Sequence, residues 1–267
     1  MEQRGADAGI DTDVAHSARI WNYWLGGKDH YDVDSQVGEE IARAFPAIVR
    51  IARADRAFLA RAVRHLADEA GVRQFLDIGT GLPTVDNTHE VAQRAAPDAR
   101  IVYVDNDPLV LAHARALLSS TPEGATDYLD ADLREPATIL EGAARTLDLT
   151  RPVAVTLLGI VHFLLDDEEA REIVGRLMDA VPSGSHLVLS HATAVVDPAG
   201  ISANIRLWNE HGEPRMRTRT PEEIARLFTG LDLLDPGVVS FPHWRPEPSP
   251  WGPPEPLDGY CGVARKP

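Results

Sequence analysis

The stretch Phe75–Thr84, Phe-Leu-Asp-Ile-Gly-Thr-Gly-Leu-Pro-Thr, decides the fold of this chain. An acidic residue, Asp77, stands in its short apolar run, and Gly79 and Gly81 follow directly after that run. Glycine lets the backbone turn tightly and lets a ligand approach it closely. The stretch therefore predicts a buried strand that ends in a ligand-binding turn.

Two further predicted strands also end in carboxylates. Asp105 follows Arg100–Val104 and stands 28 residues after Asp77, about the distance at which a nucleotide-binding βαβ unit places the acid that grips the ribose hydroxyls. Asp132 comes shortly after the third run, Thr126–Leu129. Carboxylates accept hydrogen bonds from ribose and adenine but repel phosphate. The three acids therefore favour S-adenosylmethionine (SAM), or its product S-adenosylhomocysteine (SAH), as the ligand.

An NAD-linked oxidoreductase is the competing cofactor class. Dinucleotide sites use G-x-G-x-x-G and seat the pyrophosphate on a helix N-terminus. Here the third glycine is missing, because Leu82, Pro83 and Thr84 follow Gly81. SAM carries a sulfonium, an ammonium and a carboxylate but no phosphate, so it tolerates Asp77 beside the glycine turn.

Composition excludes several other classes. A chain of 267 residues with 44% hydrophobic and 25% charged residues suits one globular α/β domain with an appendage. The net charge of −15 argues against a nucleic-acid partner. A single cysteine, Cys261, suits a reducing cytoplasm, which is where we expect the protein. We expect no membrane span, because no apolar run approaches the length of about 18 residues that a span needs. We expect no signal peptide, because the acidic N-terminus lacks the basic segment followed by an apolar one. No His or Cys spacing indicates a metal site.

The chain divides into three predicted parts: a disordered tail over 1–14, a helical cap over 15–71, and an α/β domain over 72–267 that forms one unit with the cap. Asp34 or Ser35 is expected to cap a helix that runs through Ala44. An amphipathic helix is predicted over Ala47–Ala70, where apolar residues recur at helical spacing and Gly71 follows.

After residue 72 strands and helices alternate, which predicts a parallel sheet with helices on both faces. The predicted strands are Gln74–Ile78, Arg100–Val104, Thr126–Leu129, Val153–Leu158, His186–Ser190, Leu231–Ser240 and Gly259–Arg265. The predicted helices are Pro108–Leu118, capped by Asp107, then Asp166–Val181 and Pro221–Thr229, which opens with a capping box at Thr220. The segment 197–219 has no clear pattern. Seven strands, with an antiparallel pair at the end, correspond to the Rossmann-like class I SAM methyltransferase fold.

Three segments carry a resemblance to a known family: Arg19-Ile-Trp-Asn-Tyr-Trp-Leu-Gly-Gly-Lys-Asp-His, Phe75–Thr84, and Val102-Tyr-Val-Asp-Asn-Asp-Pro. They resemble an actinobacterial family known as DUF574, renamed S-adenosyl methyltransferase, from about Asp11 to the C-terminus. One departure is Trp21–Trp24, where the family often has an aromatic-Asp-Tyr-aliphatic run. The resemblance implies SAM binding and names no substrate.

The methionine end of SAM is expected at the glycine turn. Asp77 would hold it directly or through water, although a helix cap is the alternative role. Gly79 and Gly81 would allow close approach of the backbone. Thr80 and Thr84 are expected either to donate hydroxyls to the SAM carboxylate or to cap the next helix.

The adenosine end is expected at the two other acids. Asp105 would accept hydrogen bonds from both ribose hydroxyls, and Asn106 would line the adenine edge. Asp132 would accept from the adenine amino group, with the backbone N–H of Leu133 facing a ring nitrogen. Asp130 competes for that role, but Asp132 is preferred because it lies past the strand end.

Residues after the fourth and fifth strands are the candidates for chemistry. Leu158 and Gly159 should line the cofactor, since class I enzymes place cofactor and acceptor here. His162 and His191 are candidate general bases, because imidazole can take a proton near neutral pH. The alternative for both is a buried polar residue with a structural role.

The N-terminal cluster Tyr23, Gly26, Gly27 and Lys28 suggests a lid. Tyr23 could face the sulfonium by cation–π attraction, and Lys28 could meet the SAM carboxylate. The alternative is a hydrophobic helix that docks on the sheet and ends at the two glycines. Together these features predict a methyltransferase that acts on an unidentified small molecule, with a non-catalytic SAM sensor as the alternative. They do not indicate an oligomeric state.

Overall fold

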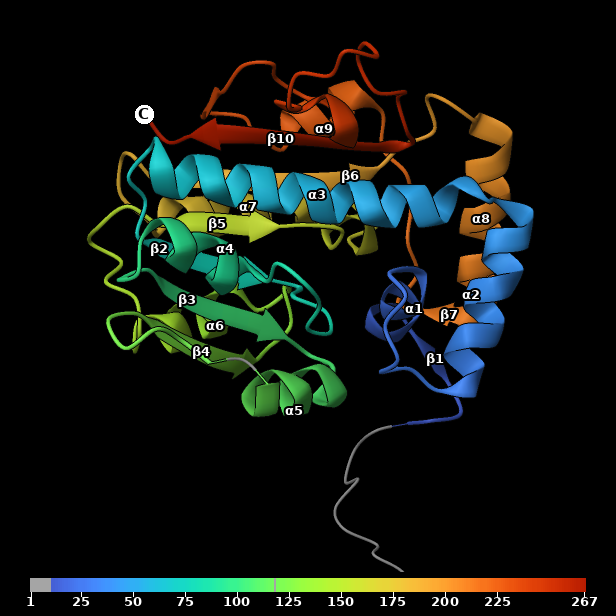
Figure 1. The fold of residues 1–267 in the computed structure, drawn as a ribbon, viewed down its shortest axis with the longest axis horizontal. Coiled ribbons are helices and arrows are strands. Elements are labelled where there is room, and N and C mark those ends of the chain that lie inside the picture. The colour runs from blue at the N-terminus through green and yellow to red at the C-terminus, as the bar shows by residue number, and fades with distance from the viewer. Residues whose placement is uncertain (1–10, 118) are drawn as a thin grey trace, which may run out of the picture.

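A mixed β-sheet, which has eight strands among the residues that the structure describes, lies at the centre of the computed structural model in Figure 1. The described residues are 11–117 and 119–267. The parallel strands, in their order along the sheet, are β4 (Ala125–Asp130), β3 (Arg100–Asp105), β2 (Gln74–Ile78), β5 (Ala154–Leu157) and β6 (His186–Ala192). The antiparallel strands beyond them are β10 (Gly259–Arg265), β8 (Asp232–Leu233) and β9 (Val239–Ser240).

This order confirms the predicted α/β fold, with β10 antiparallel to β6 as expected for the last strand. One predicted strand differs. The run Leu231–Ser240 is divided into β8 and β9, because the chain turns between them. Gly237 has a φ of 86°, and its N–H donates to the Leu234 carbonyl at 2.8 Å. Only glycine adopts that conformation without strain.

Side chains alternate across the sheet, so each strand feeds two cores. Phe75 and Ile101 pack on one face, and their neighbours Leu76 and Val102 pack on the other. The first core is covered by α3 and α4, and the second by α6, α7 and α9. The bounds of the sheet helices are α3 (Ala47–Asp68), α4 (Thr88–Ala95), α5 (Pro108–Leu117), α6 (Pro136–Ala143), α7 (Asp167–Asp179) and α9 (Pro221–Arg226).

A second group of elements stands beyond the carboxyl ends of the parallel strands, toward which the arrows of β3 and β5 point in Figure 1. Its members are β1 (Ala15–His16), α1 (Ser17–Trp24), α2 (Asp32–Ala44), α8 (Pro198–His211) and β7 (Gly212–Glu213). β1 pairs with β7, and α2 packs against α8. Segments far apart in sequence therefore close over one edge of the sheet.

Helix boundaries differ from the predictions in a few places. α2 begins at Asp32 rather than after Asp34, and the Asp34 carboxylate accepts from the Tyr31 N–H at 2.9 Å as the second half of a capping box. Asp107 caps α5 as predicted, accepting from the Leu109 N–H at 2.9 Å. Three helices, α4, α6 and α8, were not predicted from the sequence. α4 and α6 have only eight residues each, which is too short for a clear helical period, and α8 lies in the segment 197–219, whose pattern is unclear.

The start of the described chain is held in place. Arg19 donates to the carbonyls of Asp11 at 3.0 Å and Val14 at 2.9 Å. Of the tail predicted to be disordered, residues 1–10 lie outside the described residues.

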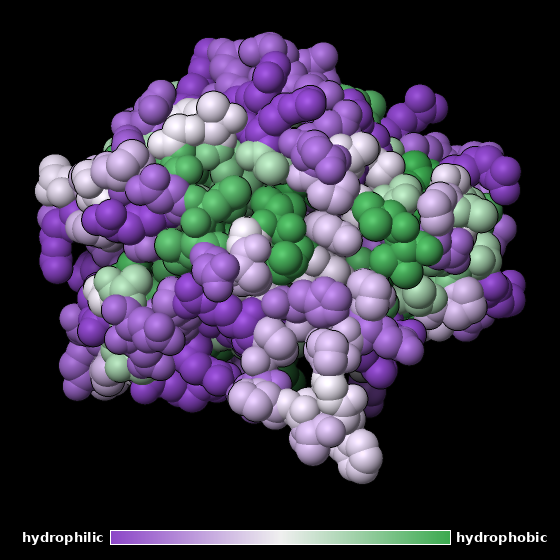
Figure 2. All heavy atoms as spheres, turned by 90° about the horizontal axis from the view of Figure 1, so that it is seen from above, coloured by the Kyte–Doolittle hydropathy of each residue, from purple (hydrophilic) through white to green (hydrophobic). Residues whose placement is uncertain are grey.

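The face of the molecule drawn in Figure 2 is mostly polar. Hydrophilic residues cover most of the face in Figure 2, and hydrophobic residues gather there only in patches. Among the described residues, the helices include none that is both long and apolar enough to cross a membrane.

Candidate functional site

A cavity of about 400 Å³ lies at the carboxyl ends of the parallel strands. This volume is within the usual range for small-molecule sites. Its walls include most of the residues predicted from the sequence: Asp77, Gly79, Thr80, Gly81, Asp105, Asn106, Asp132, Leu133, Leu158, Gly159, His162 and His191. Parallel strands bring their carboxyl ends to the same edge, which is why residues so far apart in sequence meet here.

Asp77 is buried at the end of β2 and is held by two hydroxyls. Thr156 donates to its Oδ1 at 2.7 Å and Thr88 to its Oδ2 at 2.6 Å. Burial raises the pKa of Asp77, while these hydroxyls and the nearby Arg56 act in the opposite direction. The bond to Thr88 joins β2 to the first turn of α4. Each carboxylate oxygen still has a lone pair for a ligand.

The glycine turn presents backbone to the cavity. Gly79 has a φ of 75°, and a Cβ there would lie 2.8 Å from the Ile160 side chain. Gly81 has a φ of 67°. The Thr80 hydroxyl donates to the Asp77 carbonyl at 3.1 Å, so it braces the turn. The cap of α4 is Asn87, and not Thr80 or Thr84, which answers one of the alternatives left open by the sequence.

Asp105 ends β3 beside this turn. Its Oδ2 accepts from the Gly81 N–H at 2.8 Å and its Oδ1 from the Asp107 N–H at 3.0 Å. Burial raises the pKa of Asp105, and these two N–H donors lower it. The carboxylate is therefore fixed in orientation at the cavity wall and retains lone pairs for further donors.

The adenine side of the predicted site is formed by Asn106 and Asp132, whose side chains are bonded at 3.3 Å. Leu133 lines the cavity beside them. Asp130, the competing acid, is exposed at the end of β4 and lies outside the cavity wall. Asp132 therefore lines the cavity and Asp130 does not, while the contact of Asp132 with adenine stays a prediction.

The N-terminal cluster is placed differently from the prediction. Tyr23, Gly27 and Lys28 do not line the cavity. The Tyr23 hydroxyl bonds Glu39, Lys28 is exposed, and Gly27 packs against the side chain of Asn22. Successive helical residues point in different directions, so the other side of α1 faces inward. The cavity residues from this segment are His16, Ser17, Ala18, Trp21, Asn22, Trp24 and Leu25.

His191 has no free ring nitrogen. Its Nδ1 lies 2.7 Å from the Ala192 carbonyl and its Nε2 lies 2.8 Å from Nη1 of Arg219. A carbonyl only accepts and a guanidinium only donates, so Nδ1 carries the proton and Nε2 accepts. Burial lowers the pKa of His191 well below its usual value. This arrangement leaves His191 no ring nitrogen free to act as the expected general base, and its contact with Arg219 holds the cavity wall together.

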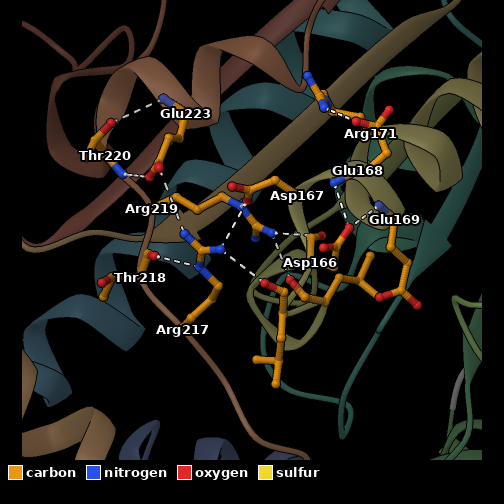
Figure 3. Close-up of polar contacts among 12 residues, drawn as sticks. Asp166, Asp167, Glu168, Glu169, Arg171, Arg217, Thr218, Arg219, Thr220 and Glu223 are labelled. Carbon is orange, nitrogen blue, oxygen red and sulfur yellow. Dashed lines mark hydrogen bonds and ion pairs between the residues drawn. The ribbon is translucent and has the colours of Figure 1, made fainter.

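Arg219 is buried and ties this histidine to the segment after β5. It also donates to Asp167 at 2.7 Å and to the Leu164 carbonyl at 2.8 Å. Figure 3 shows Arg217 beside it, within reach of the same Asp167. The unassigned segment 197–219 therefore supplies the arginines that hold the cavity wall in place.

His162 lies in a short 3₁₀ turn after β5 and is 7% exposed. Its Nδ1 has no hydrogen-bond partner among the described residues. Burial lowers the pKa of His162 to about 3, with a smaller effect from Arg219. The imidazole is therefore neutral at pH 7 and can accept or donate one hydrogen bond.

Asp55 and Arg56 on α3 also line the cavity, and the sequence analysis missed both. Asp55 is 7% exposed, and its Oδ1 has no partner among the described residues. Burial raises the pKa of Asp55 to about 6. The available signal was its position: Asp55 falls in the apolar stripe of α3 between Ile51 and Phe58, where a charge is unexpected.

The chain is similar to one known family and to two solved structures of full length. The S-adenosyl methyltransferase family matches residues 3–267. A DUF574 family protein from Streptomyces avermitilis is 48% identical, with a TM-score of 0.92 over 96% of this chain and 99% of its own. A protein from Thermobifida fusca, described as a candidate methyltransferase, is 40% identical, with a TM-score of 0.88 and 97% of both chains covered.

More distant structures share only the fold. Mitomycin 7-O-methyltransferase is 15% identical, with a TM-score of 0.52 over 93% of this chain and 71% of its own. A search of curated proteins found no match.

Proposed function

Because the chain belongs to the S-adenosyl methyltransferase family, whose cofactor is SAM, we propose that it transfers the SAM methyl group to a small-molecule acceptor. The observation that carries the proposal is the position of Asp105. Its buried carboxylate is fixed against the glycine turn at the wall of a cavity large enough for a small ligand. Fixed acceptors of this kind suit ribose hydroxyls and not phosphate.

The residues of the cavity fit SAM at both ends. Asp105 would hold the ribose, and Asn106, Asp132 and Leu133 would surround the adenine. At the methionine end the glycine turn offers bare backbone. Arg56, which is anchored by Asn87 at 3.0 Å, lies close enough to Asp77 to affect its pKa and supplies a cation for the carboxylate. Arg56 therefore takes the part that the sequence analysis assigned to Lys28.

The rest of the cavity is suited to an acceptor. Bound SAM supplies an electrophilic methyl group on a sulfonium. The chain then has to align the acceptor and exclude water, and alignment alone can contribute several kcal/mol. Trp21, Trp24, Phe163 and Trp208 supply apolar walls beyond the glycine turn. A pure SAM sensor needs no such space, so these walls support turnover over the sensor alternative.

Titration calorimetry with SAM, SAH and NAD tests the cofactor. We expect saturable binding of SAM and SAH and none of NAD. Binding of NAD without SAM would contradict the proposal. Release of SAH in the presence of an acceptor, followed by mass spectrometry, then separates turnover from sensing.

A further inference from the structure

Four buried polar atoms of the cavity wall have no hydrogen-bond partner among the described residues. Nδ1 of His16 lies 2.9 Å from the Asp107 carboxylate, which leaves Oδ1 of Asp55, Nδ1 of His162 and Oδ1 of Asn204. Each of these last three residues is at most 7% exposed. Buried polar groups are normally hydrogen-bonded, so a group of unsatisfied ones at a cavity indicates a ligand that completes them.

Their surroundings are aromatic. Trp24 and Trp208 line the same cavity, with ring centroids 6.4 Å apart. Their indole N–H groups are already used, by the Gly38 carbonyl at 3.0 Å and the Pro214 carbonyl at 2.8 Å. The rings therefore offer only apolar surface, which suits the hydrocarbon or aromatic part of a ligand.

The carboxylate of Asp55 indicates that this ligand carries a positive charge or an N–H donor. A carboxylate only accepts hydrogen bonds, and Oδ1 of Asp55 has no partner among the described residues. The Ser190 side chain and the charge of Arg56 lower the pKa of Asp55, but burial outweighs both. The neighbouring Arg56 directs its guanidinium to Val85 and Asn87 instead. A buried carboxylate with an unsatisfied oxygen is costly, and a bound cation or N–H donor would lower that cost.

Asp55 and His162 also lie beside the same backbone position. A Cβ built on Gly159 would be 3.9 Å from Oδ2 of Asp55 and 3.8 Å from Cε1 of His162. Gly159 follows β5, where the sequence analysis placed cofactor and acceptor together. The carboxylate is therefore at the junction of the predicted SAM site and the aromatic walls.

We propose that the methyl acceptor is an amine carried on an apolar or aromatic group, and that Asp55 binds its nitrogen. This rests on the proposed function. The ammonium form passes one proton to the Asp55 carboxylate, and the nitrogen lone pair then forms the N–CH₃ bond. The electron pair of the S–CH₃ bond stays on sulfur, which gives SAH and a methylated ammonium product. Solvent takes the proton from Asp55 when the product leaves.

The test uses matched probes. Benzylamine, phenethylamine and tryptamine are each titrated into the SAH complex of the full chain, alongside the alcohol and the carboxylate that share the same ring and linker. We expect at least one amine to bind tenfold or more tightly than its carboxylate partner. Asp55→Asn should remove that preference and leave the dissociation constant of SAH within twofold. Asp68→Asn, which neutralises an exposed carboxylate on the same helix, should change neither.

Several outcomes would overturn the inference. One is the absence of any preference for amines in the unmodified protein. Another is that Asp55→Asn weakens SAM or SAH tenfold, which would assign Asp55 to the cofactor. A loss for SAM alone would indicate contact with the sulfonium. In all three cases the proposed function still stands if the unmodified protein binds SAM. If the unmodified protein does not bind SAM at all, the proposed function itself is contradicted.

Discussion

The carboxylate of Asp105 accepts a hydrogen bond from the backbone N–H of Gly81 at 2.8 Å, which joins the end of β3 to the turn after β2. The two positions are 24 residues apart in sequence. The bond aligns the acid expected to hold ribose with the backbone expected to hold the methionine end. This one contact therefore fixes the position of the proposed ribose-binding acid relative to the glycine turn.

Replacing this acid should weaken cofactor binding. Asp105→Asn keeps an acceptor for the turn but removes the charge, and a charge-assisted hydrogen bond contributes about 1.5–3 kcal/mol. We expect SAM to bind roughly ten- to a hundredfold more weakly by calorimetry. The matched control is Asp130→Asn, the exposed register partner of Asp105 on β4. Equal affinities for the two variants would show that Asp105 serves only the backbone.

A methyl group on the glycine turn should be poorly tolerated. In Gly79→Ala the new Cβ would lie 2.8 Å from Ile160, and the φ of 75° is strained for alanine. We expect a loss of about 1–3 kcal/mol in stability from the strain, together with weaker SAM binding. Gly175→Ala is the control, because that helical glycine has open space around it and alanine favours the helix. Unchanged melting and binding of Gly79→Ala would refute the close approach.

Asp55 should cost stability at neutral pH. The pKa of Asp55 is about 6 in the folded protein and 3.8 in the unfolded chain, so the folded state binds the proton more tightly. The stability that this proton contributes is fully present below pH 3.8 and is lost as the pH rises through 6. Asp55→Asn removes the buried charge and should stabilise the fold at pH 7 by about 1–3 kcal/mol. The gain should vanish near pH 4. Denaturant melts of both proteins at several pH values measure it, and a gain that is independent of pH would contradict the mechanism.

His162 should make the stability of the fold depend on pH in the opposite direction. Its folded pKa of about 3 lies below the ordinary 6.5, so the unfolded chain binds a proton first and stability falls as the pH drops from 6.5 toward 3. Each unit in that window costs up to about 1.4 kcal/mol. His162→Asn should therefore lose less stability than the unmodified protein between pH 6 and pH 4. Parallel curves would show that the imidazole is not buried and neutral.

The N-terminal segment should act on the cofactor as well as on packing. Deleting the first 34 residues removes β1, α1 and the first turn of α2, and we expect weaker SAM binding with the sheet still folded by circular dichroism. A finer comparison uses two aromatic residues of α1: Trp21→Ala, which changes the cavity wall, and Tyr23→Ala, which does not. We expect only Trp21→Ala to weaken binding. Equal effects would show that α1 contributes packing alone, and unimpaired binding by the truncated protein would rule out the lid.

The regions that the sequence predicted well share one property, which is that their signals are local. A strand that ends in an acid and a glycine turn is readable at Asp77 and Gly79, because burial and backbone conformation depend on adjacent residues. Asp107 was readable as a cap for the same reason. The missed helices α4 and α8 lack a long apolar period, although α4 does carry a capping box at Asn87 and Glu90.

The predictions that differ from the structure concern residues whose role depends on where the side chain points. Tyr23 and Lys28 suggested ligand contacts by their chemistry, but the turn of α1 directs Trp21 and Asn22 to the cavity instead. His191 suggested a base, yet Arg219 from a segment of unclear pattern occupies its free nitrogen. Neither fact is visible without three-dimensional contacts.

The sequence by itself determined the α/β fold, the glycine turn and the acids at the strand ends, because alternating apolar runs, glycine and caps act through neighbouring residues. The tertiary structure alone decided which groups share the cavity. Asp55 is an ordinary acid of a long helix in sequence. It becomes a buried carboxylate with one unsatisfied oxygen only because α3 packs across the sheet beside Gly159 and His162. Burial and pairing depend on residues that are distant in the chain, so these properties arise only when it folds.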